Sequence, residues 1–162
     1  MNQESYIKEI NHCLSKKDDE LLTGLKAYRS KSIQDQDAAF IEVEIDIELL
    51  GNYFPFGFSI IYLDNCVDQL IDYESLPSES QFLSSQLISD ELHDYDKYSF
   101  DIEPILRNQI SKWFVKIWNT ETNLINIPIF ITTHDLGLWY DVKNMKWTEN
   151  PLKTDTLGNW IK

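Results

Sequence analysis

Glycine, cysteine and histidine are scarce in this sequence, and each scarcity argues against a class of functional site. Five glycines leave little material for a phosphate-binding loop, and no P-loop, nucleophile elbow or dinucleotide-binding fingerprint occurs. The two cysteines, Cys13 and Cys66, form no C-x-x-C pair and are too few for a secreted disulfide framework, so we expect two buried thiols. The three histidines, His12, His93 and His134, stand in no zinc-binding spacing, so we expect neither a metal nor another cofactor.

Long apolar runs are also absent. No stretch approaches the roughly 20 apolar residues that span a bilayer. The N-terminus, with Glu4 and Glu9 among its first ten residues, lacks the basic and then apolar profile of a signal peptide. We therefore expect a cytoplasmic protein. A chain of 162 residues that is 43% hydrophobic can bury a core of its own, which predicts a single globular domain over residues 1–162.

Basic residues are nearly missing from the middle of the chain, whose overall net charge is −13. Residues 37–103 carry sixteen Asp or Glu and the single base Lys97, whereas the segments on either side are close to neutral. Such a charge repels nucleic acid and anionic membranes, and it attracts basic partners at rates that salt suppresses. A second interpretation is an acidic scaffold with no specific surface chemistry, whose charge serves only solubility.

One strictly alternating stretch, residues 41–49, is the strongest structural signal that the sequence contains. Apolar and acidic residues alternate there without exception. Because successive strand side chains point to opposite faces, the pattern predicts a β-strand with one apolar and one acidic face. The apolar face comprises Ile41, Val43, Ile45, Ile47 and Leu49, and the acidic face comprises Glu42, Glu44, Asp46 and Glu48.

Several segments have the apolar spacing of helices. The clearest pattern runs from Asp101 to Trp118, with Pro104 in the first turn, where its missing N–H is harmless. Residues 3–16 predict an N-terminal helix, and Asp18 or Asp19 can cap a second one. Weaker patterns predict two short helices over residues 66–71 and 78–88.

Strand signals complete the predicted fold. Residues 53–63 follow a Gly-Asn turn and predict a strand that pairs with the alternating strand in a β-hairpin. Residues 127–133, 138–142 and 145–148 predict further strands. We therefore expect an α+β fold, with N-terminal helices and one long central helix packed on one face of a mainly antiparallel sheet of four to five strands. The predicted order is N-terminal helices in 1–36, the hairpin in 37–63, a helical segment in 64–119, and strands with a tail in 120–162.

A second acidic cluster surrounds His93. Carboxylates suit hard cations such as Ca²⁺, but the spacing matches no EF-hand loop, so the sequence favours a solvated acidic loop over a metal site. We expect these acids to form one partner-binding surface together with the acidic strand face. They are Asp90, Glu91, Asp94 and Asp96.

A small hydrolase-like enzyme is the alternative, with His134 acting beside carboxylates such as Asp135 or Asp141. Same-face acids of the alternating strand lie roughly 7 Å apart, within the range of inverting glycosidases, but every alternating strand has that spacing. No catalytic motif supports either arrangement, and the sequence therefore argues against an enzyme.

The leading hypothesis is a non-enzymatic acidic protein-interaction module that binds a basic partner. A small acidic α+β protein without catalytic motifs is similar in profile to immunity and inhibitor proteins, which neutralise basic toxins by electrostatic complementarity. The similarity is to that class in general and rests on no family motif. We expect a basic protein partner, and neither nucleic acid nor a membrane.

Overall fold

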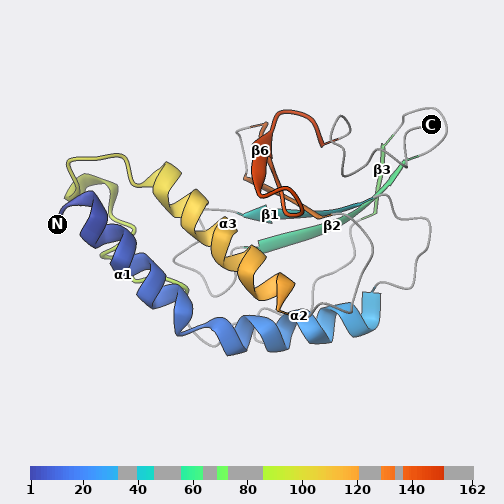
Figure 1. Ribbon diagram of the computed structural model, residues 1–162, viewed down its shortest axis with the longest axis horizontal. Coiled ribbons are helices and arrows are strands. Elements are labelled where there is room, and N and C mark those ends of the chain that lie inside the picture. The colour runs from blue at the N-terminus through green and yellow to red at the C-terminus, as the bar shows by residue number, and fades with distance from the viewer. Residues whose placement is uncertain are drawn as a thin grey trace. The chain divides into compact units, whose positions relative to one another are not determined.

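The computed structural model describes residues 1–32, 40–45, 56–63, 69–72, 86–120, 129–133 and 137–151. Two compact units alternate along the chain, and each is described by itself. The helical unit takes its described residues from 1–28 and 86–120, and the sheet unit takes the others. The described residues form three α-helices and the strands of one sheet, which confirms the predicted α+β class. Figure 1 shows these elements. The single-domain organisation stays a prediction.

The two predicted N-terminal helices are α1 (Gln3–Ser15) and α2 (Asp18–Ser32). The Asn2 side chain caps α1 by accepting a 2.9 Å hydrogen bond from the Ser5 N–H. α2 begins with Asp18 as its first helical residue, whereas the sequence predicted Asp18 or Asp19 as the capping residue before the helix. The acidic residues of its first turn interact favourably with the helix dipole. α1 buries one stripe at four-residue spacing, formed by Tyr6, Ile10 and Leu14.

The predicted central helix is α3 (Glu103–Asn119), which lies beside α1 (Figure 1). Pro104 falls in its first turn, as expected, and Asp101 Oδ1 accepts a 3.1 Å hydrogen bond from the Glu103 N–H. The predicted apolar stripe is confirmed by burial. The buried residues are Ile105, Leu106, Ile110, Ser111, Trp113, Phe114, Val115, Ile117 and Trp118.

Asp18 connects the start of α2 to the middle of α3. Its Oδ1 accepts a 2.7 Å hydrogen bond from Trp113 Nε1. Its Oδ2 accepts one of 2.7 Å from the Lys116 ammonium. One carboxylate therefore binds two residues of α3, and this sets the position of α2 in the helical unit.

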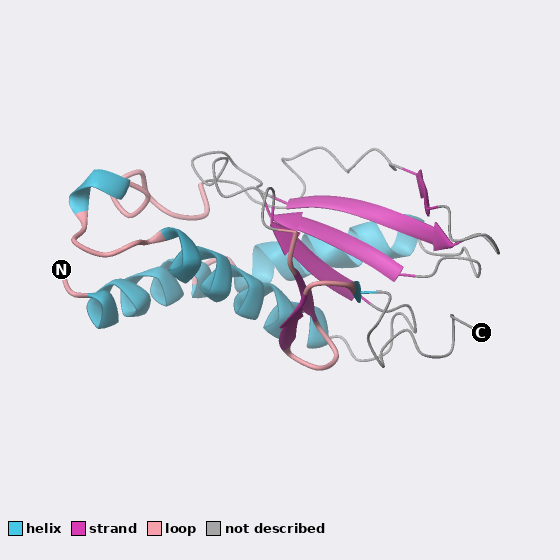
Figure 2. Ribbon diagram, turned by 90° about the horizontal axis from the view of Figure 1, so that it is seen from above, coloured by secondary structure: helices cyan, strands magenta, loops and turns pink. Residues whose placement is uncertain are grey.

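The sheet has six strands in the order β3-β2-β1-β4-β5-β6. β1 (Phe40–Ile45) and β2 (Phe56–Leu63) form the predicted antiparallel pair. β1 also pairs in parallel with β4 (Ile129–Thr133). β5 (Trp139–Asp141) and β6 (Lys146–Thr148) continue the sheet with antiparallel pairings from β4. The sheet is therefore mainly antiparallel, as predicted, with one parallel pairing in its middle (Figure 2).

The strand β3 (Gln69–Asp72) corrects the sequence prediction for this segment. The pattern of residues 66–71 predicts a short helix, but Leu70 and Ile71 pair antiparallel with β2. β3 also raises the strand number above the predicted four to five. The predicted helix rested on Cys66, Val67, Leu70 and Ile71. Apolar residues over so short a segment do not separate a helix from a strand, and pairing with the edge of β2 decides the structure.

The other predicted short helix, over residues 78–88, is wrong where the structure describes it. Leu87 and Ile88 lie in a bend, and both side chains are buried. The rest of that segment lies outside the described residues. Leu87 and Ile88 are therefore core residues supplied by irregular backbone and not by a helix.

Both faces of β1 contain buried residues, which the alternating sequence did not predict. Phe40 shares a face with Glu42 and Glu44, yet it is buried. It packs edge-to-face against Phe130 of β4, with ring centroids 5.3 Å apart. The two carboxylates on this face are half-buried. Val43 and Ile45 of the predicted apolar face are fully buried, as expected.

Gly137, between β4 and β5, allows the energetic cost of a positive φ to be measured. Its φ of +58° is a left-handed conformation that costs residues with a side chain about 1–2 kcal/mol. A Cβ at this position would meet no atom within 4 Å, so Gly137→Ala changes the backbone energy without a clash. We expect the substitution to lower the free energy of unfolding by about 1 kcal/mol in urea denaturation. Gly137→Asn should lose less, and an alanine variant as stable as the wild type would contradict the assignment.

Candidate functional site

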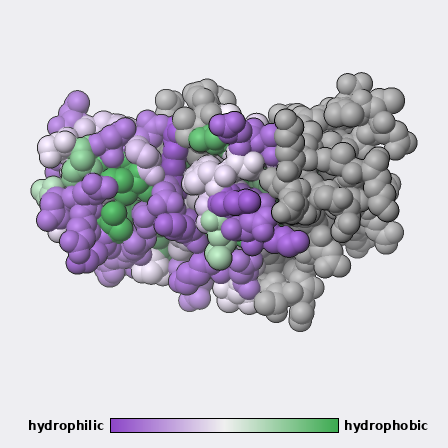
Figure 3. All heavy atoms as spheres, turned by 45° about the horizontal axis from the view of Figure 1, so that its top comes forward, coloured by the Kyte–Doolittle hydropathy of each residue, from purple (hydrophilic) through white to green (hydrophobic). Residues whose placement is uncertain are grey.

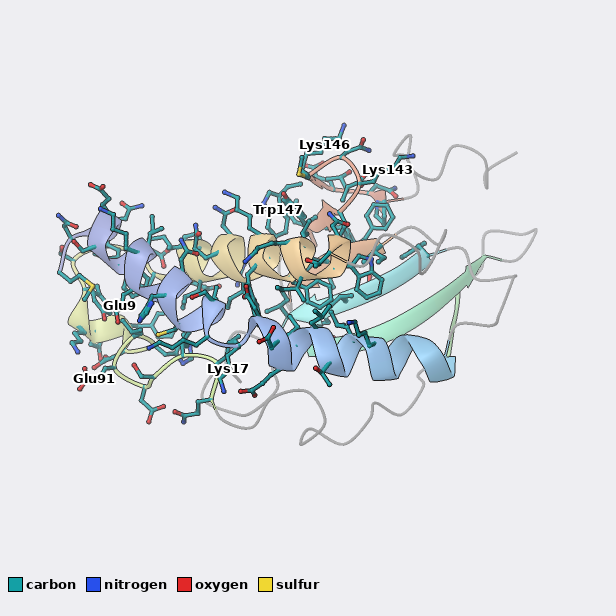
Figure 4. All side chains as sticks on the ribbon, turned by 60° about the horizontal axis from the view of Figure 1, so that its bottom comes forward. Glu9, Lys17, Glu91, Lys143, Lys146 and Trp147 are labelled. Carbon is teal, nitrogen blue, oxygen red and sulfur yellow. The ribbon has the colours of Figure 1, made fainter. Side chains whose placement is uncertain are left out.

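The acidic loop, residues 90–96 of the helical unit, carries four of the predicted partner-binding acids. All four carboxylates are exposed, and Lys97 is the adjacent base. Figure 3 shows that hydrophilic residues make up most of the described surface on the visible face. The acids are Asp90, Glu91, Asp94 and Asp96, of which Glu91 is labelled in Figure 4.

Buried groups hold the backbone of the acidic loop in place. Leu92 is buried, and its carbonyl accepts a 2.6 Å hydrogen bond from the Tyr6 hydroxyl of α1. The Tyr98 hydroxyl donates to the Glu91 carbonyl at 3.0 Å. The Tyr6 ring packs edge-to-face against Tyr98 and Phe100, at centroid distances of 4.8 and 5.6 Å. The carboxylates are therefore presented on a backbone anchored to α1 by an aromatic cluster.

Hydrogen bonds inside the acidic loop set its local shape. Asp94 Oδ1 accepts a 3.1 Å hydrogen bond from the Asp96 N–H, and Asp94 caps the short 3-10 helix η3 (Tyr95–Lys97). The Lys97 ammonium lies 3.4 Å from Glu91 Oε2, and this exposed ion pair contributes little to stability. The four carboxylates stay exposed around η3 despite these contacts.

Tyr95 places an aromatic ring among these acids. It is 45% exposed, and its hydroxyl lies 3.3 Å from His93 Nε2. The two ring centroids are 5.2 Å apart. Burial lowers the pKa of His93 below its usual range, while the charge of Asp90 acts in the opposite direction. His93 is therefore uncharged at neutral pH and leaves the negative charge of the loop in place.

The described members of the acidic strand face, Glu42 and Glu44, belong to the sheet unit. Glu42 Oε2 accepts a 2.7 Å hydrogen bond from Trp139 Nε1 of β5, whose indole reaches across β4. Because both carboxylates are half-buried, they are less accessible to a partner than the acidic loop. Asp46 and Glu48 lie outside the described residues. The joint surface of strand and loop acids stays a prediction.

Asp141, one of the carboxylates of the hydrolase-like alternative, has a structural role in the β5–β6 hairpin. It has 0% exposure, and its Oδ1 accepts hydrogen bonds from the N–H groups of Lys143 and Asn144 at 3.0 Å each. Its Oδ2 accepts a 2.8 Å bond from Asn144 Nδ2. Asp141 therefore braces a turn. His134 and Asp135 lie outside the described residues.

The potential metal ligands of the described residues form no metal-binding group. Among these residues, no group of three or more His, Cys, Asp or Glu residues could hold a metal ion. Cys13 of α1 is a free thiol, half-buried where burial was expected, and that burial raises its pKa. Cys66 lies outside the described segments.

The turn of the β5–β6 hairpin, residues 142–145, is a feature that the sequence analysis missed. Met145 has a φ of +52°, a conformation that costs a residue with a side chain about 1–2 kcal/mol. It is also 68% exposed. Lys143 and Lys146 of the same hairpin are exposed and labelled in Figure 4. Turn positions of this kind favour Gly or Asn, so a methionine there carries no sequence signal for the conformation.

Comparisons with known proteins do not place the chain in a family: no protein-family model matches it, and no significant match was found among curated proteins or solved structures. In the segments that the structure describes, no helix is long and apolar enough to cross a membrane.

The anchor of the acidic loop can be tested with Tyr6→Phe. The substitution removes the hydroxyl but keeps the ring, and it leaves the buried Leu92 carbonyl without its 2.6 Å donor. We expect the free energy of unfolding to fall by about 1–3 kcal/mol. Amide exchange of the Leu92 and His93 N–H groups should also accelerate, because these groups donate to the Ser89 and Asp90 carbonyls next to the lost anchor. Tyr98→Phe is the matched control and should cost less, because its hydroxyl bond is exposed. Unchanged exchange in Tyr6→Phe would contradict the anchor.

The lowered pKa of His93 predicts a pH dependence of stability. Since burial disfavours the imidazolium, the unfolded chain binds more protons than the folded one as the pH falls below about 6.5. The stability contribution of neutral His93 is therefore complete above that pH and is lost as the pH falls through the folded-state pKa. His93→Gln should flatten this part of the curve of unfolding free energy against pH. In an NMR titration, Asp90→Asn should lower the pKa of His93 further, and a wild-type pKa at or above 6.5 would contradict the burial effect.

Proposed function

We propose that this chain is a non-enzymatic protein-interaction module whose acidic loop binds a basic protein partner. The proposal rests on one observation: four exposed carboxylates stand on a loop that is anchored by the buried Tyr6–Leu92 hydrogen bond. A surface that is ordered before binding loses less conformational freedom on association than a mobile acidic tail does.

The negative charge of this surface would raise the association rate and the selectivity for basic partners more than the binding affinity. The four carboxylates of the loop act together with the chain's net charge of −13. Complementary charge raises association rates by about 10- to 1,000-fold at low salt, and rim ion pairs add little binding energy. The same charge disfavours nucleic acid and anionic membranes as partners.

Tyr95 supplies the contact from which affinity would come. Tyrosine is one of the residues in which binding energy concentrates at protein interfaces. A Lys or Arg of the partner that packs on the exposed ring face gains a cation–π interaction, and the neighbouring carboxylates can accept its hydrogen bonds. The acidic loop therefore combines an aromatic anchor with a negatively charged rim.

The more specific part of the proposal is an immunity-type or inhibitor-type protein that acts in the cytoplasm on a basic toxin. Small size, strong negative charge and the lack of catalytic motifs support it. An oligolysine or oligoarginine peptide can stand in for the toxin in a first binding experiment, because it presents the same charged groups.

Charge reversal in the acidic loop tests the proposal. Glu91→Lys with Asp96→Lys changes two exposed carboxylates and leaves the Asp94 cap in place. We expect the association rate with an oligoarginine peptide to fall by about tenfold at low salt, because the local attraction becomes repulsion. The difference from the wild type should shrink as the ionic strength rises.

The matched control is Glu4→Lys with Glu149→Lys, which changes the net charge equally at exposed positions outside the loop. It should slow association less than the loop variant does. Circular dichroism should show that both variants are folded. Equal slowing by the two variants would mean that only net charge matters, and the acidic loop would lose its role as the binding surface.

A further inference from the structure

We propose that the turn of the β5–β6 hairpin is a second interaction surface, and that it fits a protein partner with an apolar pocket ringed by carboxylates. Met145 would enter the pocket, and Lys143 and Lys146 would face its rim. The turn lies in the sheet unit and carries the opposite charge to the acidic loop, so this inference does not depend on the function proposed above.

Backbone strain is the first observation behind the proposal. Met145 is the non-glycine residue with a positive φ among the described residues, at +52°. Glycine would adopt this conformation without the steric cost. Strained residues persist only where the surrounding structure enforces the conformation, and they cluster at active sites, ligand clamps and switch regions. A methionine at this position therefore points to a role for the side chain itself.

Exposure is the second observation. Met145 is 68% exposed, and its flexible, polarisable thioether adapts to apolar pockets in binding surfaces. Its side chain contributes little to the core of its own sheet unit at that exposure. A partner that covers Met145 would bury apolar surface that the folded chain leaves in water.

The neighbouring charges define the partner. Lys143 and Lys146 are exposed, and the acid of the same hairpin, Asp141, is buried, so the exposed charges of residues 139–148 are positive. Carboxylates on the rim of the pocket would complement them. An anionic membrane is disfavoured as the partner because its negative surface potential repels a chain with a net charge of −13. The carboxylates of a pocket rim would instead act at short range on the two lysines.

The turn is also rigid enough to present these side chains. The buried Asp141 accepts three hydrogen bonds from Lys143 and Asn144, at 2.8 to 3.0 Å. Behind the turn, the rings of Tyr140 and Trp147 pack edge-to-face with centroids 5.3 Å apart. A turn that is fixed by these hydrogen bonds and by this ring pair loses little conformational entropy on binding.

Selection from a random peptide display library tests the proposal, with wild-type protein as bait and Met145→Gly protein for counter-selection. Selected peptides should combine Asp or Glu with apolar residues. A resynthesised peptide should bind Met145→Gly about tenfold more weakly than the wild type, or weaker still. The same variant should unfold at a higher urea concentration, because glycine relieves the strain. Loss of binding in a more stable protein excludes misfolding as the cause.

Charge variants and vesicles complete the experiment. Lys146→Gln should weaken peptide binding, whereas Lys112→Gln, an exposed lysine of α3, should not. The proposal is overturned if no selected peptide depends on Met145, or if the selected peptides are basic. It is also overturned if vesicles of phosphatidylcholine and phosphatidylserine sediment the wild-type protein but not Lys146→Gln, since the turn would then be a membrane contact.

Discussion

The parallel pairing of β1 with β4 joins the strand group β3-β2-β1 to the group β4-β5-β6. Without it, β1 and β4 would each be an unpaired sheet edge. Parallel neighbours cannot be connected by a tight turn, and between β1 and β4 the chain passes through β2, β3 and α3. The same pairing brings Trp139 within reach of Glu42, because only β4 separates their strands.

Acidic residues have different environments in the two units. In β1, Glu42 and Glu44 share a face with the buried Phe40 and are half-buried beside it. In the acidic loop, the backbone is anchored through Leu92 while the carboxylates remain exposed. A carboxylate committed to an indole N–H serves folding, whereas exposed carboxylates on a fixed backbone can serve recognition. Negative charge in the sequence therefore does not by itself locate a binding surface.

Two of the described residues of the sheet unit have a positive φ, and only one of them is of the residue type that this conformation favours. Gly137 is the residue type that a positive φ favours. Met145 has the same backbone geometry without the expected residue type. The sequence does not reveal the energetic cost at Met145, because that cost depends on its φ. Exposed apolar side chains with such a cost are reasonable places to look for a binding contact.

The sequence by itself determined the elements whose apolar spacing is long and regular. α1, α3 and the β1–β2 pair all follow from periodicity, and Asp18 and Asp19 indicated the beginning of α2 to within two residues. The sequence did not decide the structure of Leu70 and Ile71, which form a strand because the edge of β2 is available to pair with them. The tertiary structure alone decided which acids are exposed, that Phe40 is buried on the acidic face, and that Met145 projects from a strained turn. Periodicity predicts which residues lie on the same face of a helix or strand. Burial depends on what packs against that face, and backbone strain depends on the conformation of the turn.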